Sequence, residues 1–476
     1  MRLKNFLLEV NFMRRSTNML SGPLWASLIS YTIPIILTSI LQLLFNAADL
    51  VIVGRYSGSI NVAAVSATGS ITNLIVNLFI GLSIGAGVTV AHALGGNHKQ
   101  EVHRTVHTAL PTALVGGVLL SIVGVLFSET FLTMMNTPEN VLPLSAKYMR
   151  IYFCGMTFTM VYNFCASILR AAGDTKSPLI FLTLAGIINV VLNVFFVVIL
   201  KMTVDGVALA TVISQAISAV LVVIALMRRT DACKLSLRKM RFYKQPFLKI
   251  IRIGLPAGIQ SSMFAISNVI VQSSINSFNS EALMSGNGAA ANIEGFIFVT
   301  MNSFHQTAVN YIGQNMGAHQ YERIKKIFGA CLLLVSIVGF ATGFAVWSFG
   351  EELLGVYITD SAEAIAYGLI RFNYIALPYF ICGLMDVSTG ALRGLGASVT
   401  PMLLSILGVC GIRIMWIYTV FQIPKFHTPE WLYIAYVISW FGTFVFQTTA
   451  FIYIYKKRVR ADRNIPNMPA LKGEVA

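Results

Sequence analysis

Apolar residues form long runs along the chain, and short groups of charged residues, proline or glycine separate one run from the next. A helix of about 20 apolar residues is long enough to cross a hydrocarbon core of ~30 Å. Each run of that length therefore predicts one transmembrane helix, and the sequence as a whole predicts an all-α membrane protein. The twelve predicted transmembrane helices cover residues 27–53, 62–92, 106–128, 145–169, 178–200, 206–227, 249–276, 285–313, 327–349, 364–392, 399–421 and 431–455.

The amino-acid composition supports this prediction, because 56% of the 476 residues are hydrophobic and only 11% are charged. A soluble protein builds its core with a smaller share of apolar residues. The segment before the first run contains no apolar stretch long enough for a cleaved signal peptide. We therefore expect the first run to stay in the mature protein and to anchor it in the membrane.

Most basic residues lie in loops on one side of the predicted membrane. With twelve spans both termini lie on that side, which receives the basic segments 2–15, 99–104, 170–176, 228–252, 323–326 and 456–472. The opposite side receives Arg55, Lys147, Arg150, Lys201, Arg371 and Lys425. Because cytoplasmic loops carry the excess of lysine and arginine, we expect a multi-pass protein of the cell (inner) membrane with both termini cytoplasmic. Topology thus accounts for the net charge of +15, and we expect no nucleic-acid partner.

The two halves of the chain repeat each other. Pro34 and Pro256 lie 222 residues apart in similar surroundings, "GGNHKQEVHR" matches "MGAHQYERIK", and "LRAAGDTKSP" matches "LRGLGASVTP". Six spans separate the members of each pair, so the halves have parallel topology about an axis along the membrane normal. The predicted parts are a cytoplasmic tail (1–24), a six-helix bundle (25–228), a basic cytoplasmic linker (229–247), a second six-helix bundle (248–456) and a cytoplasmic tail (457–476).

An acid, Asp49, lies within the first predicted helix. A charged residue near the middle of a span costs at least ~2.5 kcal/mol, so it tends to face a cavity or a polar partner. Gln42 and Asn46 share its helix face, and Asn189 and Asn193, four residues apart, share one face of the fifth predicted helix. The alternative is that these groups only form interhelical hydrogen bonds, worth about 0.6–2 kcal/mol each.

Polar residues also recur within the spans of the second half. Two stripes with four-residue spacing could line a cavity, namely Asn268, Gln272 and Asn276, and then Asn302, Gln306 and Asn310. Asp386 is predicted to be a substrate or second proton site, or else a buried structural acid, and the repeat pairs it with Asn163. Glu294 could line the cavity or could instead serve helix packing.

Four segments carry a resemblance to a known family: "DLVIVGRYSG", "GLSIGAG", "LRAAGDTKSP" and "YIGQNMGA". In their order and spacing they resemble the multidrug and toxic compound extrusion (MATE) transporters, and the resemblance covers about residues 20–456. It implies twelve transmembrane helices in two pseudo-symmetric six-helix bundles around a central cavity. It also implies export of organic compounds in exchange for H⁺ or Na⁺.

The resemblance also implies roles for individual residues. Asp49, Asn189, Asn193 and Thr211 occupy the places at which the family binds its coupling cation, and Asp49 would be the Na⁺ ligand of a sodium-coupled protein. Asn193 stands where many relatives carry aspartate, which leaves one carboxylate and favours H⁺. The residues expected to line the substrate cavity are Gln42, Asn46, Asn163, Asn268, Gln272, Gln306 and Asp386.

We therefore expect a secondary antiporter that exports organic, often cationic, small molecules. The alternative is a flippase for lipid-linked saccharides, which shares this architecture; a cavity rich in arginine or lysine would favour it, and Arg413 is the exception in spans that hold almost none. An enzyme is not expected, because HExxH, GxSxG and paired-carboxylate arrangements are missing. The expected partners are small-molecule substrates and the lipid bilayer, with no cofactor beyond the coupling ion, and we expect a monomer.

Overall fold

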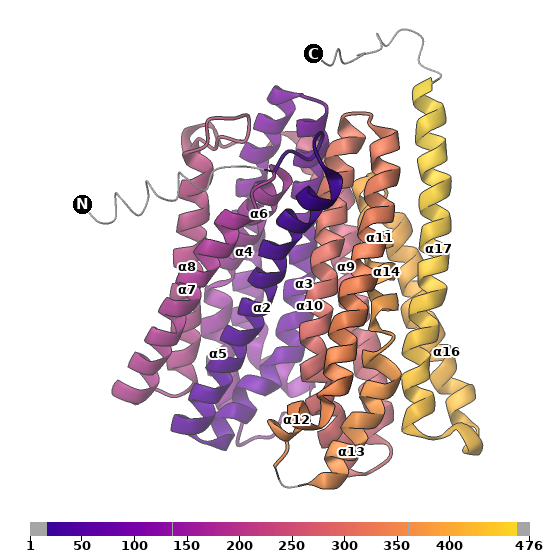
Figure 1. Cartoon of the computed structure of the whole chain (residues 1–476). Helices are drawn as coiled ribbons and strands as arrows, with labels where there is room; N and C mark the ends of the chain where they lie inside the picture. The colour runs from indigo at the N-terminus through magenta and orange to yellow at the C-terminus, as the bar shows by residue number, and fades with distance from the viewer. Residues whose placement is uncertain (1–16, 136, 360, 464–476) are drawn as a thin grey trace.

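The protein is a bundle of long helices that run close to parallel with one another (Figure 1). The computed structural model describes residues 17–135, 137–359 and 361–463. Within these ranges all regular structure is helical, which confirms the predicted all-α class. Most of the two predicted tails, 1–24 and 457–476, lies outside the described residues.

The described part of the first half contains seven α-helices and one π-helical turn. They are α2 (Leu24–Ser57), α3 (Ser59–Gly95), α4 (Lys99–Met134), α5 (Leu142–Cys154), α6 (Met156–Ala171), α7 (Lys176–Asn193), the π turn η1 (Val194–Ile199) and α8 (Val204–Met227). A bend of 46° at Gly155 separates α5 from α6. The fourth predicted helix, 145–169, is therefore a bent pair rather than one straight span.

A segment with one short 3-10 turn, η2 (Leu237–Lys239), connects the halves. The second half begins with α9 (Lys244–Asn276), α10 (Glu281–Gly317), α11 (Tyr321–Ser348), α12 (Gly350–Gly355) and α13 (Ala362–Arg371). It continues with the π turn η3 (Phe372–Ala376), α14 (Tyr379–Gly394), α15 (Val399–Ser405), the π turn η4 (Ile406–Gly411) and α16 (Ile412–Tyr418). It ends with the 3-10 turns η5 (Val420–Gln422) and η6 (Pro424–Phe426) and with α17 (Pro429–Arg463).

All twelve predicted runs coincide with helical segments, but they are not equally apolar. In the described part of the chain nine segments are long and apolar enough to span a membrane, and eleven if the bent pairs α5–α6 and α13–α14 each count as one span. The remaining run, 285–313, lies in α10, which has 37 residues but carries the polar stripe at Asn302, Gln306 and Asn310.

Buried apolar side chains form two main clusters. One draws on α3, α4, α5, α6 and α8 in the first half, and the other on α9, α10, α11, α14 and α17 in the second. The second cluster also includes Leu28, Tyr31 and Ile35 of α2. The Tyr31 ring packs edge-on against Tyr311 of α10, with ring centroids 5.2 Å apart. The start of α2 therefore packs against the other half of the molecule.

Glycine allows α3 and α9 to pack backbone against backbone. A Cβ atom added to Gly81 would overlap the backbone nitrogen of Gly258, and one added to Gly85 would overlap the carbonyl oxygen of Ile250. Side chains at these positions would push the two helices apart, because the overlapping atoms belong to the backbone. This line of glycines lets the two halves meet through backbone atoms along α3 and α9.

Candidate cation site and polar face

The four residues predicted to hold a cation lie together in the first half. Asp49 belongs to α2, Asn189 and Asn193 to α7, and Thr211 to α8. The Asn193 side-chain amide donates to Asp49 Oδ1 at 2.5 Å, and the Thr211 hydroxyl donates to Asp49 Oδ2 at 3.4 Å. Two further helices thus bring polar groups to the carboxylate of α2.

The two asparagines of α7 extend this cluster. Asn193 also donates to Asn189 Oδ1 at 3.2 Å, and Asn189 donates to Thr211 Oγ1 at 3.5 Å. The side-chain oxygen of Asn193 is buried and has no hydrogen-bond partner. A buried acceptor without a donor costs free energy. The cluster therefore has an oxygen available for a proton donor or a cation.

Local sequence explains why α2 and α7 come so close. Gly186 faces Phe45 of α2, and a Cβ atom at this position would overlap the ring. The α-helix α7 ends at Asn193, and the π turn η1 follows directly. Such turns interrupt the regular hydrogen-bond ladder and are frequent at functional sites. The side chains of Asn189 and Asn193 therefore reach Asp49 just before this irregular turn.

A small cavity adjoins the cluster. Its volume is about 40 Å³, which suits a few water molecules or one ion and is far below the 300–1,000 Å³ or so of a drug-sized pocket. Its polar lining residues are Gln42, Asn46, Asp49, Asn189, Thr211, Ser214, Gln215 and Ser218. Gln42 and Asn46, predicted to line the substrate cavity, thus lie beside the cation residues.

The hydrogen-bond partners of Asp49 are neutral side chains. Among the ion pairs of the described residues, none includes this carboxylate. Burial disfavours an uncompensated charge. The cluster can therefore relieve the charge on Asp49 by taking up a proton or by coordinating a cation with its neutral oxygens.

Exposed amides mark a polar face on both halves. Gln42 and Asn46 of α2 are exposed, as are Asn268, Gln272 and Asn276 of α9. Polar groups within a span are expensive in lipid, so we expect these exposed amides to line a space that water reaches.

The other predicted cavity residues are less open. Gln306 is half-buried and donates to Asn302 on its own helix at 3.3 Å. Asn163 is also half-buried, and it donates to the carbonyl oxygen of Thr159 at 2.9 Å. Neither side chain contacts the cluster around Asp49 through a hydrogen bond among the described residues.

Asp386 lies inside the second half rather than on the polar face. His305 Nδ1 donates to its backbone carbonyl oxygen at 2.8 Å, while Arg393 donates to His305 Nε2 at 3.1 Å. Since arginine can only donate, this histidine carries its proton on Nδ1. The side-chain Oδ2 of Asp386 is buried without a hydrogen-bond partner. Asp386 is thus separate from the predicted cavity residues Asn268, Gln272 and Gln306.

An ion pair that the sequence did not reveal joins α10 to α13. Arg371 donates from Nε and Nη2 to the two oxygens of Glu294, at 2.9 and 2.7 Å, and from Nη1 to Asn287 at 2.7 Å. Both ionic side chains are buried. Arg371 therefore does not serve as a loop residue at the membrane surface, and Glu294 does not line the cavity. A search for an acid and a base in neighbouring polar stripes could have paired them.

A comparison with models of protein families shows which family the chain belongs to. The model of one family, MatE, matches the chain twice, over residues 34–195 and 256–419. The chain belongs to the MatE family. The two matches begin at Pro34 and Pro256, the prolines that the repeat places in register.

Several characterised or named proteins are similar to this MatE-family chain. The Probable multidrug resistance protein YoeA of Bacillus subtilis is 25% identical over 398 residues, which cover 82% of this chain and 85% of that protein. The Probable multidrug resistance protein NorM of Thermotoga maritima is 24% identical, with 81% and 83% covered. The Multidrug export protein MepA of Staphylococcus aureus is 19% identical, with 83% and 87% covered.

Solved structures of MATE transporters have the same fold. A multidrug resistance MATE family transporter of the MOP superfamily in its outward-facing conformation superposes with a TM-score of 0.85 at 19% identity, covering 95% of this chain and 99% of that chain. A MATE structure in the bent conformation gives a TM-score of 0.84 at 18% identity, covering 94% and 98%. The MatE-family chain is thus an all-α membrane protein of two pseudo-symmetric bundles, as the sequence predicted.

Proposed function

We propose that this protein is a secondary antiporter that exports organic, often cationic, small molecules in exchange for a coupling cation. The named relatives support export, since they are multidrug resistance or multidrug export proteins. The observation that carries the proposal is the cluster around Asp49. It presents one carboxylate without a basic partner, neutral oxygens from two further helices and a cavity of ion size.

Cation binding at this cluster would drive export by changing the balance between two conformations. A ligand shifts such an equilibrium only by the difference in its affinity for the two states. Asp49 comes from α2, whose first turns pack on the second half, while Asn193 and Thr211 come from α7 and α8. A movement of α2 relative to α7 and α8 would therefore change the coordination of the cation, and so its affinity.

We propose H⁺ as the coupling ion. Asn193 is an amide where a second carboxylate would strengthen Na⁺ binding, and Asp49 alone supplies the negative charge. A single carboxylate exchanges a proton without further ligands. Asn189, Asn193 and Thr211 would then orient the carboxyl group, although their oxygens could also complete a Na⁺ site with Asp49 as its charged ligand. No other cofactor is proposed.

Asp386 and the polar face would serve the substrate. The exposed amides Asn268 and Gln272 offer uncharged hydrogen-bonding groups, while Asp386 would affect which compounds are exported more than whether coupling occurs.

We also propose that the protein acts as a monomer in the cell membrane with both termini cytoplasmic. A flippase for lipid-linked saccharides is less well supported, because the described part of the chain holds few buried arginines and one of them, Arg371, is neutralised by Glu294.

Transport by proteoliposomes tests this proposal. The purified protein should expel ethidium under an imposed pH gradient without Na⁺, and a Na⁺ gradient at equal pH should have no effect. The Asp49→Asn variant should lose transport under the pH gradient and stay inactive under the Na⁺ gradient, because an amide neither exchanges a proton nor carries a charge. The control is Glu351→Gln, which removes an exposed acid of α12 and should transport like the wild type.

Two results would contradict the proposal. Export driven by Na⁺ alone would overturn the proton assignment and leave the antiporter in place. Undiminished coupling in Asp49→Asn would overturn the role given to the whole cluster.

A further inference from the structure

Arg413 of α16, in the second half of the chain, is a further buried charged residue. Its side chain is only 4% exposed. Nε donates to the hydroxyl of Ser439 at 3.1 Å, and Nη1 donates to the amide oxygen of Asn268 at 3.3 Å. The guanidinium carbon lies 3.9 Å from the centre of the Tyr436 ring. All of these neighbours are uncharged.

Arg371 provides the contrast within the same half. It lies 5.7 Å from the same Tyr436 ring, yet both oxygens of Glu294 neutralise its charge. Among the ion pairs of the described residues none includes Arg413. Burying an unpaired charge is costly, and two neutral oxygens and the rings of Tyr436 and Trp440 offset only part of that cost. Arg413 therefore has the surroundings of a group whose anionic partner is not part of the protein.

The internal repeat places this arginine at a position equivalent to the edge of the cation cluster. The offset of 222 that pairs Pro34 with Pro256 also pairs Asn46 with Asn268. The offset of 223 between Pro178 and Pro401 pairs Val190, next to Asn189, with Arg413. In the first half α2 meets α7 beside the acid Asp49. In the second half the equivalent helices, α9 and α16, meet at the base Arg413.

We propose that Arg413 is a binding site for an anionic group, above all a carboxylate, on the organic compounds that this protein transports. The proposal rests on the export function and names a class of substrate: compounds with a carboxylate attached to an aromatic or cationic body. A guanidinium binds a carboxylate through charge-assisted hydrogen bonds, and its fork of donors suits two oxygens at once.

The polar face gives the substrate its approach to Arg413. Asn268, which accepts from Nη1, is exposed, and Gln272 one turn further along α9 is exposed as well. An exposed amide changes rotamer readily, so a carboxylate can take the place of the Asn268 oxygen. Ser439 and Tyr436 would stay in contact with the guanidinium and hold it in position.

Two dyes that differ only in the carboxylate test the site directly. Rhodamine B carries an ionised carboxylate at neutral pH, and rhodamine B methyl ester does not. Binding to the purified wild-type protein in detergent, followed by fluorescence anisotropy, should be about tenfold tighter for rhodamine B than for the ester, as expected for one charge-assisted hydrogen-bonded contact. Arg413→Gln should remove this preference and leave the affinity for the ester unchanged.

A second variant keeps the arginine and supplies its missing counter-charge. Asn268→Asp has nearly the same shape as the wild type and places a carboxylate next to Nη1, so it should also abolish the preference for rhodamine B. Arg371→Lys is the matched control, because it alters the arginine already paired with Glu294, and it should retain the preference. A melting temperature close to that of the wild type shows that each variant is folded.

The outcomes separate this inference from the export function. Equal binding of the two dyes by the wild type, absence of binding, or a preference that survives both Arg413→Gln and Asn268→Asp would overturn the inference. Displacement of rhodamine B from the wild type by phosphatidylglycerol would assign the anion to a lipid headgroup and overturn the substrate assignment. If the wild-type protein did not export ethidium, in contrast, the proposed antiport function would be wrong. The result of the dye-binding experiment would still stand.

Discussion

Asp49 and Glu294 are both acids within apolar helices, but their neighbours differ in charge. Glu294 meets the guanidinium of Arg371 with both oxygens, whereas Asp49 meets only an amide and a hydroxyl. A paired acid has its charge compensated permanently. An acid with neutral neighbours needs a mobile ion or a proton, and this difference separates a structural carboxylate from a candidate coupling carboxylate.

The residue-scale prediction concerns the buried ion pair. Arg371→Met should lower the free energy of unfolding by about 3–5 kcal/mol, because it leaves the Glu294 carboxylate buried without its partner. The double variant Arg371→Met, Glu294→Leu should lose less than the single one, since no charge then remains. Thermal unfolding of the purified protein in detergent measures both effects. A double variant less stable than Arg371→Met would show that the pair itself contributes the stability.

At the scale of helices, the glycines of α3 and α9 set the distance between the two halves. Each lacks the Cβ atom that would overlap the opposite backbone, at Gly258 for Gly81 and at Ile250 for Gly85. Helices that meet through backbone atoms gain close packing that larger residues would prevent. The π turn η1 acts on a single helix, because it interrupts the regular α-helical hydrogen bonds directly after Asn193.

The element-scale prediction follows from that packing. Gly81→Ala should destabilise the protein by about 1–3 kcal/mol, the usual cost of forcing an extra methyl group into a packed interface. It should also slow ethidium export, because α3 and α9 can no longer approach. Gly329→Ala is the control: this exposed position of α11 has no atom within 4 Å of an added Cβ, and alanine should add about 0.5–1 kcal/mol of helix stability. Equal melting temperatures for the two variants would contradict the proposed role of the glycine contact.

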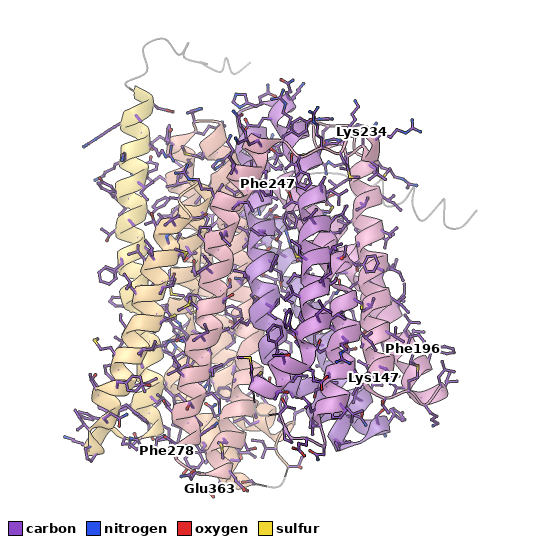
Figure 2. The ribbon with its side chains drawn as sticks, turned by 180° about the vertical axis from the view of Figure 1, so that it is seen from behind. Lys147, Phe196, Lys234, Phe247, Phe278 and Glu363 are labelled. Carbon is purple, nitrogen blue, oxygen red and sulfur yellow. The ribbon has the colours of Figure 1, made fainter. Side chains whose placement is uncertain are left out.

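At the scale of the whole molecule, topology determines which side each loop faces. The linker residue Lys234 lies at one end of the bundle and Glu363 of α13 at the other (Figure 2). The start of α2 and the end of α17 lie at the same end as the linker (Figure 1). Because the basic loops gather at that end, we expect it to be cytoplasmic.

Labelling with a membrane-impermeant maleimide checks this orientation. In a Cys154→Ala background, which removes the exposed cysteine among the six free ones, Glu363→Cys should react in intact cells. Lys234→Cys should react only after the membrane is permeabilised, because we expect the linker to be cytoplasmic. Both positions are exposed, so access of the reagent does not limit the reaction. The reverse pattern would show that the charge distribution does not determine the orientation of this chain.

The sequence by itself determined the features that depend on local order along the chain. Runs of apolar residues located the helical segments, and matching motifs such as the prolines Pro34 and Pro256 identified the repeated halves. Helical spacing placed Asn189 and Asn193 on one face, because residues four apart project in the same direction. The resemblance to MATE transporters then associated that face with Asp49, and the structure brings the three side chains together.

Only the tertiary structure decided which faces meet. Arg371 and Glu294 are 77 residues apart, and nothing in either local sequence states that α13 packs on α10 with these side chains opposed. Asp386 is likewise buried, and its backbone carbonyl oxygen accepts from His305, which in turn accepts from Arg393. Periodicity fixes the relative directions of side chains within one helix, but the rotation of that helix against its neighbours depends on packing of the whole bundle. For the same reason the sequence shows only that Arg413 is a basic residue within a span. The tertiary structure shows in addition that Arg413 forms no ion pair with an acid among the described residues.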